Sequence, residues 1–166
     1  TRPGVPRVAV LDWESPAPNR YEIFRAAMRD LGYVEGENVL IDYRYAEERP
    51  DRAAALAAEF ANSAVNVIVA LATPAAFAAK KATSTIPVVV SSADPVGSGL
   101  VSNLARPGGN ITGVSNMLPD LESKRLELLR ELMPGLKRLA FLGSANDPAT
   151  RGFVREVQEA ATRTGM

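Results

Sequence analysis

The stretch from Val65 to Gly99 constrains the fold of this chain more than any other. Val67–Leu71 and Val88–Val90 are short apolar runs rich in β-branched residues, which is typical of parallel strands covered on both faces. Between them, Thr73-Pro74 favours the start of a helix, and Lys80-Lys81 suits its last turn, where the helix dipole attracts cations. The pattern therefore predicts a strand–helix–strand unit of a parallel sheet.

Two loops, Ala72–Ala75 and Ser91–Pro95, leave the carboxyl ends of these predicted strands. Ligands bind at this edge of open α/β sheets. A helix N-terminus adds unpaired amide donors and a partial positive charge, and small side chains would leave that surface bare for a ligand carboxylate. The alternative is an ordinary capped helix. We therefore predict ligand binding by the first turn of the helix: by the hydroxyl of Thr73, by the bare surface at Pro74, and by the amides of Ala75 and Ala76.

The rest of the chain continues the alternation of strands and helices. This order predicts the α/β class, with a Rossmann-like doubly wound parallel sheet. Residues 1–116 are expected to form one lobe and residues 117–166 a crossover with the first part of a second lobe, because Gly165-Met166 should lead into a further strand. Further strands are predicted at 7–12, 38–45, 111–115 and 138–142. Helices are predicted at 19–31, from 50 onward, at 120–133 and at 149–163, and one or two helical turns within 97–105. Asn19 and Asp120 are the predicted caps of the first and third of these helices.

Ser91, Ser92 and Asp94 follow the second strand of the organising unit. The two hydroxyls can hydrogen-bond a carboxylate or a hydroxylated ligand, and Asp94 could pair with an ammonium group. Asp94-Pro95 is equally well explained as a turn in which the Asp side chain caps the backbone. Both interpretations stay open at this point.

Four further candidates lie on other predicted loops. Trp13 follows the first strand, where it could stack on a planar ligand; the alternative is a surface or lobe-packing residue. Asn116 lies on the predicted crossing segment. Asn146 and Asp147 precede the last predicted helix, and capping of that helix is the favoured alternative for Asp147.

Composition excludes several function classes. The chain has no Cys and no His, so catalysis by a thiolate or by a Ser-His-Asp arrangement is excluded. Basic and acidic residues number 19 each, which argues against nucleic acid or an anionic membrane as partner. We expect no metal and no cofactor. Asp12, Glu14 and Asp94 near one sheet edge nevertheless leave open a second hypothesis, an enzyme that uses carboxylates or Mg²⁺.

Three stretches carry a resemblance to a known family: LGYVEGENVLIDYRYAEERPDR, then VNVIVALATPAAFAAKKATSTIPVVVSSADPVGSGLVSNLARPGGNITGVS, then LESKRLELLRELMPGLKRLAFL. Together they resemble the ABC-transporter substrate-binding proteins that include tryptophan- and phenylalanine-binding members. The resemblance extends from Arg7 to Met166. It implies the type I periplasmic-binding-protein fold, in which two Rossmann-like lobes joined by crossing strands hold a ligand in the cleft between them. In such a fold Trp13 could cover the cleft and Asn116 is expected to line its hinge side. Asn146 and Asp147 are expected to face the cleft from the second lobe.

The resemblance also implies a function. The expected protein is not an enzyme but an extracytoplasmic receptor that closes about a hinge on a small ligand and delivers it to a membrane permease. Its ligand is expected to be an aromatic or branched amino acid. The signal peptide or lipoprotein leader that such a receptor is expected to carry is absent from this sequence. A regulatory ligand-sensing domain of the same fold is the alternative. Because family members are nearly twice as long, we expect this chain to stop within the second lobe, and a homodimer could cover the apolar seam of Leu121, Leu128 and Leu132.

Overall fold

The structure, a computed structural model, describes residues 4–118, 121–163 and 165. Strands and helices alternate through most of the chain. In order they are β1 (Arg7–Asp12), α1 (Glu22–Asp30), β2 (Leu40–Tyr45), α2 (Pro50–Ala61), β3 (Val67–Leu71), α3 (Thr73–Ala82), β4 (Val88–Ser92), β5 (Ile111–Ser115), α4 (Glu122–Leu132) and α5 (Thr150–Arg163).

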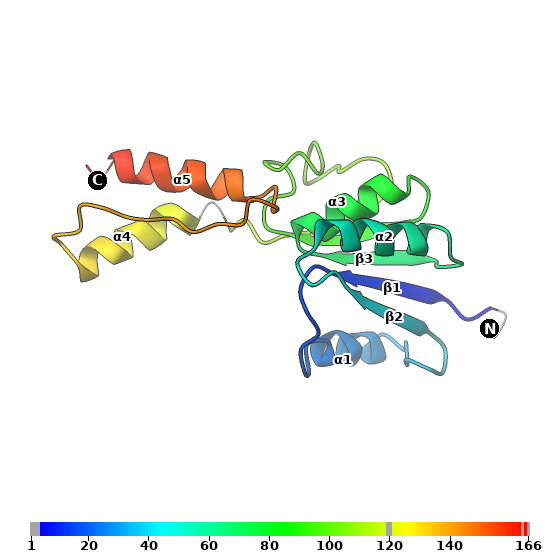
Figure 1. The fold of residues 1–166 in the computed structure, drawn as a ribbon. Helices are drawn as coiled ribbons and strands as arrows, with labels where there is room; N and C mark the ends of the chain where they lie inside the picture. The colour runs from blue at the N-terminus through cyan, green and yellow to red at the C-terminus, as the bar shows by residue number, and fades with distance from the viewer. Residues whose placement is uncertain (1–3, 119–120, 164, 166) are drawn as a thin grey trace.

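The five strands form one parallel sheet in the order β2-β1-β3-β4-β5. Helices lie on both faces: α2 and α3 cover one face, and α1 covers the other (Figure 1). The predicted α/β class with a doubly wound parallel sheet is therefore confirmed. The organising unit predicted from the sequence corresponds to β3, α3 and β4, and Lys80 and Lys81 lie in the last turn of α3.

Alternate residues of the central strands pack on opposite faces of the sheet, as the pleat of a strand requires. Ala9, Leu11 and Ile68 are fully buried in a core cluster with residues of α2 and α3. Val8 and Val10 pack on the other face, in a cluster with Tyr21 and with Phe24 and Met28 of α1. Burial on both faces explains why β1 and β3 are apolar runs. The prediction that the 88–90 strand is covered on both faces is wrong, because Val89 of β4 is 37% exposed.

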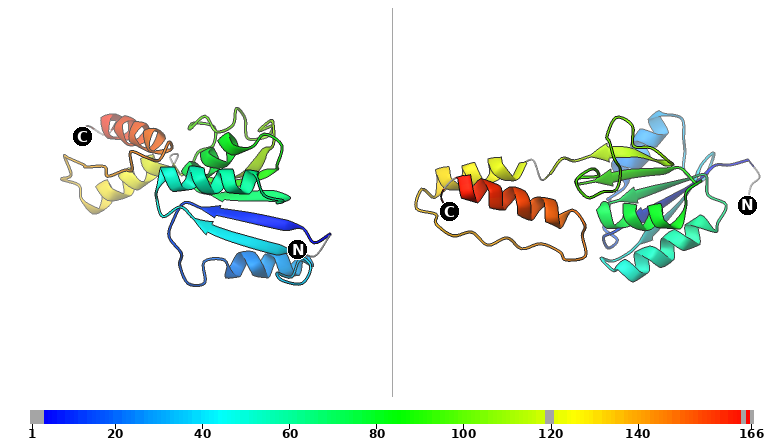
Figure 2. Two further views of the ribbon diagram at one scale, coloured as in Figure 1. Left: turned by 45° about the vertical axis from the view of Figure 1, so that its right-hand side comes forward. Right: turned by 90° about the horizontal axis from the view of Figure 1, so that it is seen from above.

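The C-terminal part lies apart from the sheet. Helices α4 and α5 pack against each other, and an extended segment connects them (Figure 2). Several large apolar side chains stay exposed here, among them Leu132 and Leu142, which are 79% and 99% exposed. Within the described residues, no helix combines the length and the apolar character needed to cross a membrane.

The predicted strand at 138–142 is wrong. Residues 138–142 are extended, but they form no strand because no other described segment lies beside them to share ladder hydrogen bonds. The helical turns predicted within 97–105 are found only at the start of this range: residues 95–99 form turns, in which the amide of Ser98 donates to the carbonyl of Asp94 at 3.1 Å. No helix follows, and further along the side chain of Asn103 accepts hydrogen bonds from the amides of Ala105 and Arg106, which favours a turn over a helix.

Two predicted helix caps have different outcomes. Asn19 does not cap α1: its backbone is in the left-handed region at φ 60°, and the helix begins at Glu22 without a side-chain cap. Asp120, the predicted cap of α4, lies outside the described residues.

Candidate ligand-binding site

The candidate site lies at the switch point of the sheet, where the strand order changes direction. From β1 the chain first adds β2 on one side, and later adds β3 and its successors on the other. The carboxyl ends of β1 and β3 meet at this point, where the amide of Trp13 donates a hydrogen bond to the carbonyl of Leu71 at 3.3 Å. In sheets of this strand order, ligands bind in the crevice at the switch point.

The two loops that leave the carboxyl ends of β3 and β4 meet here. The hydroxyls of Thr73 and Ser92 are 2.9 Å apart, and both side chains are buried. The amide of Ala72 donates to the carbonyl of Ser91 at 2.9 Å, which ties the two strand ends together. Thr73 is the first residue of α3 and not its cap, so its hydroxyl serves the contact between the loops.

The first turn of α3 has amides without partners. Within the described residues, neither the amide of Thr73 nor that of Ala75 donates a hydrogen bond, and Pro74 has no amide proton. The amide of Ala76, by contrast, already donates to the carbonyl of Ala72 at 3.1 Å. Two donors at the positive end of a helix dipole suit an anionic group such as a carboxylate.

The prediction that this turn presents a bare surface is wrong. Pro74, Ala75 and Ala76 are all buried, and the two alanines belong to the core cluster that joins α2 and α3 to the sheet. Their small side chains allow close helix packing, which a sequence pattern does not distinguish from an open surface. A ligand would therefore reach the amides from the end of the helix and not across its side.

Trp13 is mostly buried, with 9% of its surface exposed, and packs in the same core cluster. It also lines a cavity of about 180 Å³ together with Pro74, and the same cavity is lined by Asn146 and Pro148 from the C-terminal part. The structure thus brings Trp13 and Asn146 together across the gap between the two parts of the chain. Ligand contact by either residue stays a prediction.

Sequence reasoning missed the part that Asp12 has in this site. Its carboxylate is 2% exposed and accepts hydrogen bonds from the Tyr21 hydroxyl at 2.5 Å, from Arg20 at 3.3 Å and from the amide of Glu14 at 3.0 Å. Burial, and then the bond to Asp12, raises the pKa of Tyr21, so the hydroxyl stays protonated as a donor. The cluster fixes the loop that carries Trp13.

Comparison with known proteins identifies the family. The family model described as "ABC transporter substrate binding protein" matches residues 14–166. The chain belongs to this family.

Individual relatives agree with this membership. A tyrosine-binding protein of Clostridioides difficile (strain R20291) is 35% identical over 125 residues, which are 75% of this chain and 36% of that protein. A conserved domain protein of Vibrio cholerae has a TM-score of 0.88 at 30% identity, and an ABC domain of Streptococcus pneumoniae in complex with L-Trp has 0.85 at 27%. Each match covers 98% of this chain and 55% of the solved one. The chain thus spans about a third of the curated relative and about half of the solved structures.

Three predicted site residues of this family member have other hydrogen bonds. One carboxylate oxygen of Asp94 accepts the amide of Gly97 at 2.7 Å, which is the turn interpretation that the sequence left open. The carboxylate of Asp147 accepts the amide of Ala149 at 2.9 Å, which forms an Asx turn just before α5 and does not reach an amide of that helix. The backbone of Asn116 donates to Ser92 at 2.9 Å, while its side chain is exposed. Their ligand contacts stay predictions.

The acidic residues behind the enzyme hypothesis are not arranged as a metal site. Asp12 and Asp94 each accept hydrogen bonds from within the chain. No group of three or more metal-ligating side chains is found in the part of the chain that the structure describes. Of the relatives named above, one is named a tyrosine-binding protein and another is solved in complex with L-Trp.

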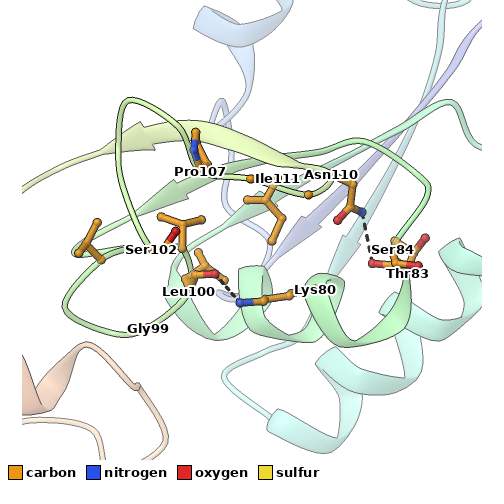
Figure 3. Close-up of a pocket in the computed structure, with 13 residues that line it drawn as sticks. Lys80, Thr83, Ser84, Gly99, Leu100, Ser102, Pro107, Asn110 and Ile111 are labelled. Atoms are coloured by element: carbon orange, nitrogen blue, oxygen red, sulfur yellow. Dashed lines mark hydrogen bonds between the residues drawn. The ribbon is translucent and has the colours of Figure 1, made fainter.

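A larger hollow of about 730 Å³ lies at the opposite end of α3 (Figure 3). There Lys80 donates to the carbonyl of Leu100 at 2.5 Å, and the side-chain amide of Asn110 donates to the carbonyls of Thr83 and Ile86 at 3.2 and 2.7 Å. These bonds hold the connection between β4 and β5 against α3. The hollow lies away from the carboxyl edge of the sheet, and two of the polar side chains that line it, Lys80 and Asn110, already hold the fold together.

Proposed function

We propose that this chain forms one lobe, residues 1–116, and the first part of the other, residues 117–166, of an extracytoplasmic solute receptor. The receptor would close about a hinge on a small ligand and present it to the permease of an ABC importer, without catalysing a reaction. The observation that carries the proposal is the switch-point edge: a buried hydroxyl pair, Thr73 with Ser92, beside two amides of α3 that have no partner among the described residues. Family membership supports it.

The ligand of the proposed receptor is an aromatic or branched amino acid. The amides of Thr73 and Ala75 would hold its carboxylate, and the hydroxyls of Ser91 and Thr73 would add hydrogen bonds. Trp13 and Pro74 supply apolar surface at the neighbouring cavity. Two relatives support this ligand class, since one is named for tyrosine binding and another is solved with L-Trp.

A thermal-shift screen tests the ligand class. The protein is heated alone and with each of the twenty amino acids, with small peptides, with sugars and with nucleosides. We expect a shift confined to one amino-acid group, because a ligand at a hundredfold excess over its Kd stabilises the folded state by about 2.7 kcal/mol. A shift only with sugars or nucleosides would contradict the proposed ligand, and a flat screen would contradict the receptor function.

We also propose that this chain self-associates through the exposed apolar side chains of its C-terminal part. Leu128 and Leu132 are 47% and 79% exposed on α4, and Leu142 is 99% exposed on the extended segment that follows. Large apolar side chains that are exposed together in one part of a chain often mark a surface that a second molecule covers. Sedimentation velocity should show a dimer that dissociates on dilution, and Leu132→Lys should shift the chain to monomer. A monomer at every concentration would contradict the proposal.

A further inference from the structure

Ala72 alone forms the corner between β3 and α3. The strand ends at Leu71 and the helix begins at Thr73, so one residue must turn the chain from strand to helix. The backbone of Ala72 has φ 72° and ψ 156°, a region that glycine adopts readily and that strains any residue with a Cβ. This strain therefore lies directly beside Thr73, whose hydroxyl and amide belong to the candidate site.

Hydrogen bonds on both sides hold this strained corner. The carbonyl of Leu71 accepts from Trp13 at 3.3 Å, and the amide of Ala72 donates to Ser91 at 2.9 Å. Rotating the Leu71–Ala72 peptide by half a turn would return φ of Ala72 to the ordinary negative range. It would also turn that carbonyl away from Trp13 and that amide away from Ser91. The strain persists because three strands, β1, β3 and β4, together determine the orientation of this one peptide.

The methyl group of Ala72 gives the corner its rigidity. It is half-buried and packs against the core cluster of α2, α3 and the sheet. Glycine could form the same corner without strain, but it would lose this contact and gain backbone freedom. Alanine at this position thus favours a single conformation at a cost in stability.

We propose that Ala72 is a positioning residue for ligand binding. The rigid corner holds the Thr73 hydroxyl against Ser92 and keeps the amides of Thr73 and Ala75 in one arrangement before the ligand arrives. A preorganised site loses less conformational entropy when it binds. The inference rests on the proposed receptor function and adds to it the residue that sets the geometry of the site.

The test compares Ala72→Gly with the unchanged protein by calorimetric titration with L-tryptophan, L-tyrosine and L-leucine, and by thermal unfolding. We expect Ala72→Gly to bind roughly tenfold more weakly, because the corner is no longer preorganised. Its Tm should be equal or higher by a few degrees, ~2–5 °C, because the strain is gone. Asn19→Gly is the matched control: Asn19 also has a positive φ, 60°, but is exposed and lies outside the site. It should leave the affinity unchanged.

Weaker binding at an unchanged or higher Tm would support a positioning role, because a residue that only maintains the fold would lower both affinity and Tm when replaced. Ala72→Gly that binds as tightly as the unchanged protein would overturn the inference while leaving the receptor function standing. An Ala72→Gly variant with both a lower Tm and a lower affinity would also overturn the inference. If the unchanged protein binds none of the three amino acids, the proposed receptor function fails and this inference fails with it.

Discussion

Replacing Asp12 with alanine should lower the free energy of unfolding by about 2–4 kcal/mol, since a buried acceptor is removed from three donors at once. The Tyr21 hydroxyl, which is in a buried hydrogen bond at 2.5 Å, would lose its partner. Arg20 would lose the more buried of its two carboxylate partners. Urea unfolding followed by the fluorescence of Trp13, the only tryptophan, measures the change and also reports the environment of that ring.

Glu14→Ala is the matched control for Asp12→Ala. Glu14 pairs with the same Arg20 at 2.5 Å, but its side chain is 55% exposed, against 2% for Asp12. An exposed ion pair contributes at most about 1 kcal/mol, so this variant should unfold almost as the unchanged protein does. Equal destabilisation by the two substitutions would show that the charge of Arg20, and not the buried hydrogen bonds of Asp12, holds this loop.

Thr73→Val should weaken amino-acid binding by about 10- to 100-fold and lower the free energy of unfolding by about 1–3 kcal/mol. Valine keeps the shape of threonine but has no hydroxyl. The hydroxyl of Ser92, which is fully buried, would then be left without the partner that it has at 2.9 Å. Calorimetric titration with L-tryptophan, L-tyrosine and L-leucine, together with urea unfolding, gives both quantities.

Two further variants separate the effects of Thr73→Val on stability and on binding. Thr73→Val combined with Ser92→Ala removes both buried hydroxyls, so stability should recover in large part while affinity stays low. Thr112→Val makes the same chemical change at an exposed position of β5 and should alter neither quantity by more than about 0.5 kcal/mol. Full recovery of affinity in the double variant would mean that neither hydroxyl contacts the ligand.

Local signals in the sequence predicted the N-terminal sheet well. The apolar runs of β3 and β4, the Thr73-Pro74 helix start and the Lys pair at the end of α3 are each encoded within a few residues. The strand predicted at 138–142 carries the same kind of signal. It fails because a strand also needs a neighbour, and no described segment provides one.

Features of the site that depend on distant residues could not be predicted. That Ala75 and Ala76 are buried depends on how α2 packs against α3, and a run of alanines fits an exposed or a buried helix equally well. Asp12 looked like a free acid because its main partner, Tyr21, is nine residues away and comes close only through the β1–α1 loop. The strain at Ala72 depends on hydrogen bonds to two other strands, which no local pattern contains.

We expect an amino acid to bind at the carboxyl edge of the sheet, at the start of α3. An amide NMR titration of the protein with L-tryptophan and L-tyrosine tests this binding directly. We expect the largest shifts at the amides of Thr73, Ala75 and Ser91–Asp94, with smaller shifts near Trp13 and Asn146. Shifts confined to the hollow beside Lys80 and Leu100, at the opposite end of α3, would contradict it.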